Sequence, residues 1–173
     1  MRRRSGALLL GLGIAIGVVW LLSEARFPAP VEAGLPAPLF ELRGLDGKAV
    51  GLESLRGQVV LVNFWATWCK PCEDEMPAME RLYQALQPRG FELLAISVDD
   101  SEEPVVAFRD LHSLTFPILM DSEKAAAADY QSFRYPESFL VGRDGVLIER
   151  YIGPREWDAP AYVSRIERLL DEG

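Results

Sequence analysis

Apolar residues occur along this chain in two kinds of run, which predict alternating strands and helices. Residues 58–65 and 91–98 are nearly continuous apolar, β-branched runs, which are typical of strands buried on both faces of a sheet. Residues 72–87 carry apolar side chains at helical spacing, and Pro77 is expected to kink or interrupt that helix. The pattern therefore predicts a buried sheet with helices packed against it.

The remaining segments extend this alternation in both directions. Asp-Gly turns predict a hairpin near each end of the region. The expected strands are residues 39–42, 49–52, 116–120, 138–141 and 146–151, and the expected helices are residues 102–111 (with Ser101 as N-cap), 122–130 and 159–170. This order predicts an α/β domain over residues 39–173, with a central mixed β-sheet flanked by helices and an N-terminal β-hairpin extension.

The N-terminal segment, residues 1–26, has the pattern of a membrane anchor. Three arginines are followed by the uncharged residues 6–22, which would span about 25 Å as a helix, against a hydrocarbon core of about 30 Å. A cleaved signal peptide is the alternative, but the uncharged run is longer than the usual signal-peptide core. Either interpretation places the domain outside the cytoplasm, and the arginines orient an anchor with its N-terminus inside. We therefore expect a single-pass membrane protein with its domain on the side of the membrane away from the cytoplasm.

Residues 27–38 are rich in proline and alanine, and we expect a stiff linker between anchor and domain. From Gly34 onward, 14 basic residues stand against 24 acidic ones, a net charge of −10. An acidic surface argues against nucleic acid as a partner, because phosphate binding relies on clustered Lys and Arg.

The chain has only two cysteines, Cys69 and Cys72, at the junction of a predicted strand and a predicted helix. The pair is too small for the disulfide framework of a secreted mini-protein or for a closed zinc site. At a helix start the free N–H groups favour the thiolate of Cys69, which is the nucleophile of disulfide exchange. Cys72, one turn further, can then resolve the mixed disulfide. Between them Pro71 stiffens the first turn, and Lys70 adds a solvated positive charge.

Residues 65–77, Trp-Ala-Thr-Trp-Cys-Lys-Pro-Cys-Glu-Asp-Glu-Met-Pro, resemble the thioredoxin superfamily. The W-x-x-W-C-x-P-C-x-x-E-x-P pattern is similar to that of its membrane-anchored TlpA/ResA/CcmG (DsbE) branch. The resemblance runs from about Pro36 to the C-terminus and implies a thioredoxin-like fold. It also implies an extracytoplasmic thiol–disulfide oxidoreductase that needs no cofactor. Such a protein would be anchored in the bacterial inner (cytoplasmic) membrane, with its catalytic domain in the periplasm or outside the cell.

Several site residues are implied by this resemblance. Pro136 matches the superfamily's cis-proline, which faces the cysteines. Taken alone, Glu75 reads as a solvated first-turn glutamate beside Glu73 and Asp74. It also matches a glutamate of this branch near the cysteines, and that match makes it an equal candidate to accept the Cys72 proton. We expect Trp68 to present apolar surface to partners, and Tyr135, with Phe133, to line the substrate groove unless both serve only in packing.

One position departs from the thioredoxin pattern. Thioredoxins carry a buried aspartate where this chain has Asn63, and an amide cannot accept a proton. The proton acceptor must then be Glu75, water or a substrate group. We assign His112, the only histidine, no catalytic role, and we expect Trp65 in the core.

The resemblance further implies reduction of client disulfides, such as apocytochrome c or copper-site cysteines, with recharging by a membrane electron donor of the DsbD/CcdA kind. A peroxiredoxin is discounted, because residues 62–69 lack the proline of a peroxidatic site. The remaining alternative is a copper(I)-binding chaperone that uses the same cysteines, with His112 or Met120 as a further ligand. No permanent metal site is expected. Neither the client nor the reduction potential follows from the sequence.

Overall fold

The computed structural model describes residues 30–172, and residues 31–172 fold as one compact unit. The predicted anchor lies outside the described residues. Among the described residues, no helix is long and apolar enough to cross a membrane.

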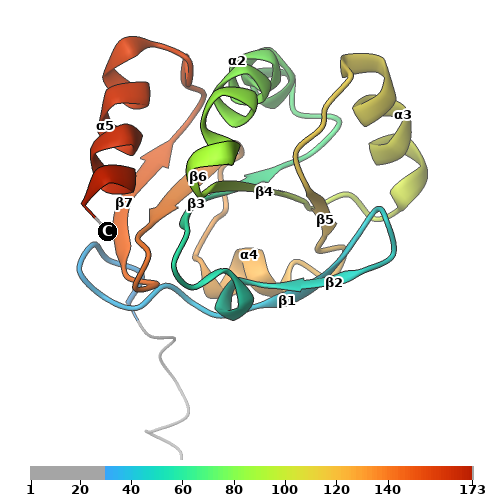
Figure 1. Cartoon of the computed structure of the whole chain (residues 1–173). Helices are drawn as coiled ribbons and strands as arrows, with labels where there is room; N and C mark the ends of the chain where they lie inside the picture. The colour runs from blue at the N-terminus through green and yellow to red at the C-terminus, as the bar shows by residue number, and fades with distance from the viewer. Residues whose placement is uncertain (1–29, 173) are drawn as a thin grey trace, which may run out of the picture. The chain divides into compact units, whose positions relative to one another are not determined.

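Seven strands form one mixed sheet at the centre of this unit (Figure 1). Its order is β2-β1-β5-β4-β3-β6-β7, with β3, β4 and β5 parallel and the other pairings antiparallel. The strands are β1 (Glu41–Gly44), β2 (Ala49–Gly51), β3 (Val59–Trp65), β4 (Phe91–Ser97), β5 (Ile118–Met120), β6 (Glu137–Val141) and β7 (Leu147–Ile152). The predicted mixed sheet with an N-terminal hairpin is confirmed.

Helices cover both faces of the sheet. Figure 1 shows α2, α3 and α5 above the sheet and the short α4 below it. They are α2 (Lys70–Leu86), α3 (Glu102–His112), α4 (Ala125–Asp129) and α5 (Pro160–Asp171), with the 3-10 turns η1 (Leu52–Leu55) and η2 (Gln87–Arg89).

The central strand β3 supplies side chains to both layers of the core, and all seven of its residues are buried. Alternate residues of a strand point to opposite faces. Asn63 and Trp65 lie on the side of α2 and α3, where the Trp65 ring is 4.8 Å from that of Phe108. Phe64 lies on the other side, 5.2 Å from the ring of Tyr130. Trp65 is therefore a core residue, as predicted.

All four helices differ from their predicted bounds, α3 and α5 by no more than one residue at either end and α2 and α4 by more. α2 continues through Pro77, so the expected interruption does not occur. Met76, Met79 and Leu82 are buried on this helix, and their packing offsets the hydrogen bond that proline cannot donate. α4 begins only at Ala125, because Lys124 adopts a left-handed conformation (φ 58°) that cannot belong to a helix.

The described part of the predicted linker lies against the sheet instead of extending away from it. Gly34 N–H donates to the carbonyl of Leu147 (2.8 Å), and Leu147 N–H donates to the carbonyl of Leu35 (2.9 Å). Val31 and Ala37 are buried. Residues 31–37 thus cover the start of the edge strand β7.

Candidate active site

The two cysteines lie where β3 leads into α2. Cys69 is the N-cap residue of α2, and its Sγ accepts a hydrogen bond from the N–H of Cys72 (3.3 Å). The two sulfurs are joined in a disulfide. Cys69 keeps 7% of its surface exposed, whereas Cys72 has none. A partner can therefore reach Cys69 first, and the helix start favours negative charge on its sulfur.

The two residues between the cysteines differ in their surroundings. Pro71 is in the first turn of α2, where its missing N–H costs nothing. Lys70 is exposed, and its Nζ lies 3.2 Å from Glu73 and 2.9 Å from Asp74. The Lys70 charge is thus solvated, as expected, and is shared with two carboxylates.

Glu75 is buried, 2% exposed, and is not a solvated first-turn residue. It follows Cys72 by one helical turn, on the same face of α2. Its Oε1 accepts a hydrogen bond from Asn63 Nδ2 (2.9 Å), and its Oε2 accepts from Arg155 N–H and Trp157 Nε1, both at 3.1 Å. Asn63 Nδ2 also donates to Ser138 Oγ (2.9 Å), which links the carboxylate to β6.

Burial raises the pKa of Glu75 from 4.5 to about 7, against the hydrogen bonds from Arg155, Trp157 and Asn63, which lower it. A carboxyl group with this pKa is partly ionised and partly protonated at neutral pH. It can take up a proton in one step and release it in another, which suits a group that exchanges protons with a nearby thiol.

The loop before β6 supplies the opposite side of the site. The Tyr135–Pro136 peptide bond is cis, as the thioredoxin resemblance implies. Tyr135 is half-buried, and its ring lies 6.1 Å from that of Trp68 in an edge-on arrangement. This contact brings together the residue before Cys69 and the residue before Pro136.

Two exposed aromatic residues belong to the segments that carry Cys69 and Pro136. The Trp68 side chain is 68% exposed and that of Phe133 is 73% exposed, which excludes core packing for both. Burial and the negative charges of Asp121 and Glu137 raise the pKa of Tyr135, so that it stays a neutral phenol. The functions assigned to Trp68, Tyr135 and Phe133 remain predictions.

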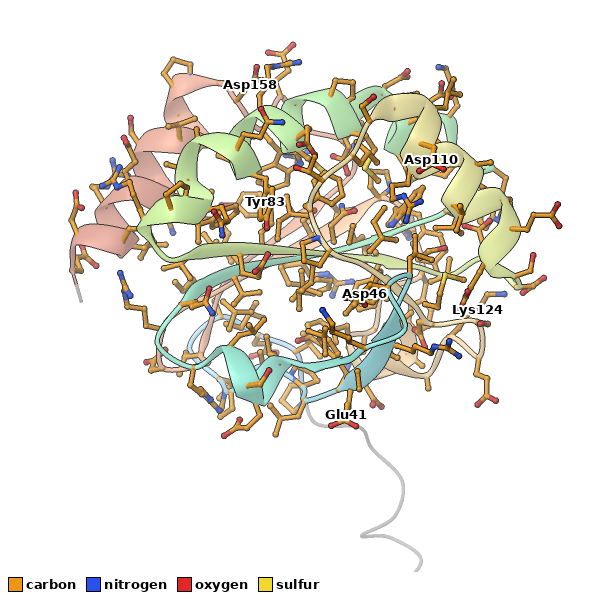
Figure 2. The ribbon with its side chains drawn as sticks, turned by 45° about the vertical axis from the view of Figure 1, so that its right-hand side comes forward. Glu41, Asp46, Tyr83, Asp110, Lys124 and Asp158 are labelled. Carbon is orange, nitrogen blue, oxygen red and sulfur yellow. A yellow bond between two sulfur atoms is a disulfide. The ribbon has the colours of Figure 1, made fainter. Side chains whose placement is uncertain are left out.

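The segment after β7 belongs to the site, although its pattern in the sequence did not identify it. Trp157 is buried, and its indole together with the backbone of Arg155 covers Glu75. Arg81 of α2 donates to Asp158 (2.7 Å; Asp158 is labelled in Figure 2), which fixes this segment beside α2. The available signal was a tryptophan in an otherwise polar stretch between a strand and a helix.

A second buried carboxylate, Asp99, holds the loop that precedes Cys69. It accepts hydrogen bonds from the backbone N–H of Thr67 (2.9 Å) and from Thr67 Oγ1 (2.6 Å). The sequence placed Asp99 at a strand end but gave no indication of its partner.

His112 ends α3 and lies closer to the motif than its position in the sequence suggested. Its Nε2 is 3.8 Å from Glu73 Oε1, and its ring packs on Phe108. Among residues 30–172, no group of three or more His, Cys, Asp or Glu side chains is arranged to hold a metal ion.

The comparisons with known proteins agree with this geometry. A model of the AhpC/TSA family matches residues 33–150. The thiol-disulfide oxidoreductase ResA of Bacillus anthracis is 36% identical over 146 residues, which cover 84% of each chain. The thioredoxin-like protein YneN of Bacillus subtilis is 41% identical over 126 residues, 71% of this chain and 73% of that one.

Solved structures show the same fold. A candidate thiol:disulfide interchange protein DsbE from Chlorobium tepidum superposes with a TM-score of 0.76 at 29% identity, over 82% of this chain and 99% of that one. A protein from Bacteroides thetaiotaomicron, described as a candidate protein disulfide isomerase, has the same TM-score at 31% identity, over 83% and 92% of the two chains.

Proposed function

The chain belongs to the AhpC/TSA family and is a thiol–disulfide oxidoreductase of thioredoxin-like fold, and from this premise we propose that it reduces disulfides of client proteins outside the cytoplasm. The observation that carries the reducing direction is the buried Glu75 carboxylate, one turn from Cys72. Its negative charge opposes a second negative charge on the sulfurs. The Glu75 charge thus counteracts the stabilisation that the helix start gives the Cys69 thiolate. A dithiol whose reduced form is less stabilised gives up its electrons more readily, whereas a strongly stabilised reduced form makes an oxidant.

The cycle uses the two cysteines in order. The Cys69 thiolate attacks one sulfur of the client disulfide, which forms a mixed disulfide and releases one client thiolate. Cys72 then gives its proton to Glu75 and attacks Cys69 Sγ. The second client sulfur leaves as a thiolate and takes up the proton that Glu75 received from Cys72. The Cys69–Cys72 disulfide closes, and two electrons have moved to the client.

The partners in this proposal come from the family resemblance. Clients are proteins with exposed disulfides, for which apocytochrome c and copper-site proteins are candidates, and a membrane electron donor of the DsbD/CcdA kind restores the dithiol. Residues 1–26 keep the domain at the outer side of the cytoplasmic membrane. Fractionation of cells that produce the full chain tests this placement, since recovery in the cytoplasmic fraction would contradict it.

The order of attack predicts different outcomes for two matched substitutions. Cys69→Ala abolishes reduction of insulin disulfides, because the accessible nucleophile is gone. Cys72→Ala retains the first step and accumulates a mixed disulfide through Cys69, which non-reducing electrophoresis and mass spectrometry detect. Equal loss in both variants without a trapped species would contradict the assigned order.

The direction is tested by the reduction potential of the wild-type domain. We expect equilibrium with a thiol–disulfide buffer to give a value at or below that of thioredoxin, about −270 mV. A value near that of DsbA, about −120 mV, would identify an oxidant instead.

A further inference from the structure

Asp99, two residues after the end of β4, accepts two hydrogen bonds from the loop before Cys69. Its Oδ2 accepts from the N–H of Thr67 and its Oδ1 accepts from the hydroxyl of Thr67. Ser97 Oγ donates to Asp99 Oδ2 (2.7 Å) and accepts from the Asp99 N–H (3.1 Å), which fixes the carboxylate itself. Asp99 is only 5% exposed, so its hydrogen bonds are shielded from water.

Thr67 lies within a tight turn. Cys69 N–H donates to the carbonyl of Ala66 (3.2 Å), so Thr67 and Trp68 form the outer part of that turn. Val98 N–H donates to the carbonyl of Trp65 (3.0 Å), which attaches the start of the same loop to the end of β4. The backbone on the N-terminal side of Trp68 is therefore held by hydrogen bonds.

Trp68 itself has little else to hold it. Its side chain is 68% exposed, and the ring contact that the structure gives it is with Tyr135. Ordering an exposed aromatic side chain costs conformational entropy, and an anchor that is already oriented binds a partner at lower cost. Fixing the backbone at Thr67 supplies part of that orientation before a client arrives.

We propose that Asp99 and Thr67 are positioning residues that hold Trp68 beside Tyr135, so that a protein client docks next to Cys69. This inference rests on the proposed function, because it concerns how protein disulfides are selected at the same site. In this proposal neither residue contacts the client. The hydrogen bonds between Asp99 and Thr67 affect docking, whereas Cys69 and Cys72 carry out the exchange chemistry.

Two disulfide substrates separate docking from chemistry. For Thr67→Val, which keeps the shape and removes the hydroxyl donor, we expect kcat/KM for insulin to fall about tenfold, corresponding to about 1.4 kcal/mol. We expect this loss to come from a higher KM, with little change in kcat. The rate with a small aromatic disulfide, which needs no docking surface, changes less than about twofold. Thr67→Ser restores the hydroxyl and returns insulin reduction to near the wild-type value.

The chain contains a matched control for this substitution. Thr115 donates its N–H and its hydroxyl to the buried carboxylate of Glu80, the same arrangement between α2 and the segment before β5. Glu80 is eleven residues beyond Cys69 along the chain, about 16 Å at 1.5 Å per helical residue. Thr115→Val therefore removes an equivalent hydrogen bond, with an equivalent cost in stability, and leaves insulin reduction unchanged.

The indole N–H resonance of Trp68 provides a direct readout by NMR. We expect it to shift in Thr67→Val and to stay in place in Thr115→Val. Should Thr67→Val not fold, Asp99→Asn replaces it, because an amide keeps one acceptor for Thr67 and gives a smaller loss in the same direction.

Equal losses of kcat/KM with both substrates would overturn the inference, since the hydrogen bonds between Asp99 and Thr67 would then affect Cys69 or the fold. Unchanged kinetics in Thr67→Val would overturn it as well. Failure of the wild-type protein to reduce insulin would instead contradict the proposed function, so the two failures are distinguishable.

Discussion

At the scale of single residues, Glu75 is a buried carboxyl group whose protonation changes near neutral pH. The carboxyl is buried, and its pKa is raised to about 7. The motif located this glutamate, but it could not tell a buried carboxyl from a solvated one. That difference depends on Arg155 and Trp157, which contact Glu75 across about eighty residues of sequence. Asn63, in contrast, could be read directly, because an amide excludes proton transfer wherever the side chain points.

Glu75→Gln is expected to change the pH dependence of resolution. In the wild type, ionised Glu75 accepts the Cys72 proton, so the rate at which Cys72 resolves a mixed disulfide rises with pH through about 7. The glutamine variant loses this inflection, and its cysteine titrations shift. Stopped-flow measurement of the resolving step between about pH 5 and 9 checks this expectation.

The same substitution gives an independent readout in stability. Because folding raises the pKa of this acid, the folded state binds more protons between pH 4.5 and 7, and the wild type loses stability as pH rises through that window. The loss attributable to Glu75 is about 3 kcal/mol, and Glu75→Gln removes it. Asp74→Asn, at an exposed position on the same helix, serves as control. A wild-type pH profile indistinguishable from that of Glu75→Gln would mean that Glu75 has no special protonation.

At the scale of elements, the pattern of apolar residues located the strands better than the helix ends. β3 and β4 start and stop within one residue of their predicted ranges, because continuous burial on both faces marks them clearly. Helix boundaries depend instead on local partners. Ser101 occupies the N-cap position of α3, but its side chain makes no capping hydrogen bond. α4 is capped from outside the helix by Asp121, whose carboxylate accepts from the N–H groups of Ala126 (3.2 Å) and Ala127 (2.8 Å).

Removing each side chain should therefore have unequal effects. Asp121→Ala leaves two buried N–H groups without a partner and is expected to lower the free energy of unfolding by about 1–2 kcal/mol. Ser101→Ala, at the residue that the sequence favours as a cap, is expected to change it by less than about 0.5 kcal/mol. Urea titration of both variants compares them, and equal effects would contradict the assignment of Asp121 as the cap.

At the scale of the whole molecule, one sheet connects segments that are far apart in the sequence. The site combines the β3–α2 junction with the β4 end, the loop before β6 and the segment after β7. The sequence predicted the fold and the first and third of these, because each carries a motif. Asp99 with Thr67, and Arg155 and Trp157 with Glu75, could not be predicted, because these pairings arise only when the strands come together.

The segment in residues 31–37 is expected to stabilise the domain. It buries Val31 and Ala37 and exchanges backbone hydrogen bonds with residues 145 and 147. The free energy of unfolding of a chain that begins at Leu39 should be about 3 kcal/mol lower than that of a chain that begins at Pro30. Thermal unfolding of the two chains measures the difference. Identical stability would mean that residues 31–37 act only as a tether and do not stabilise the domain.

The hydrogen bonds from Arg155 and Trp157 to Glu75 can form only late in the synthesis of the chain. Trp157 follows Glu75 by 82 residues, so a ribosome adding roughly 5–20 residues per second completes this contact several seconds after the cysteines have been synthesised. During that interval the nascent chain carries both thiols while Glu75 lacks its hydrogen bonds from Arg155 and Trp157. On the proposed role of Glu75, the chain would therefore control the protons of its thiols only once its C-terminal residues have been synthesised.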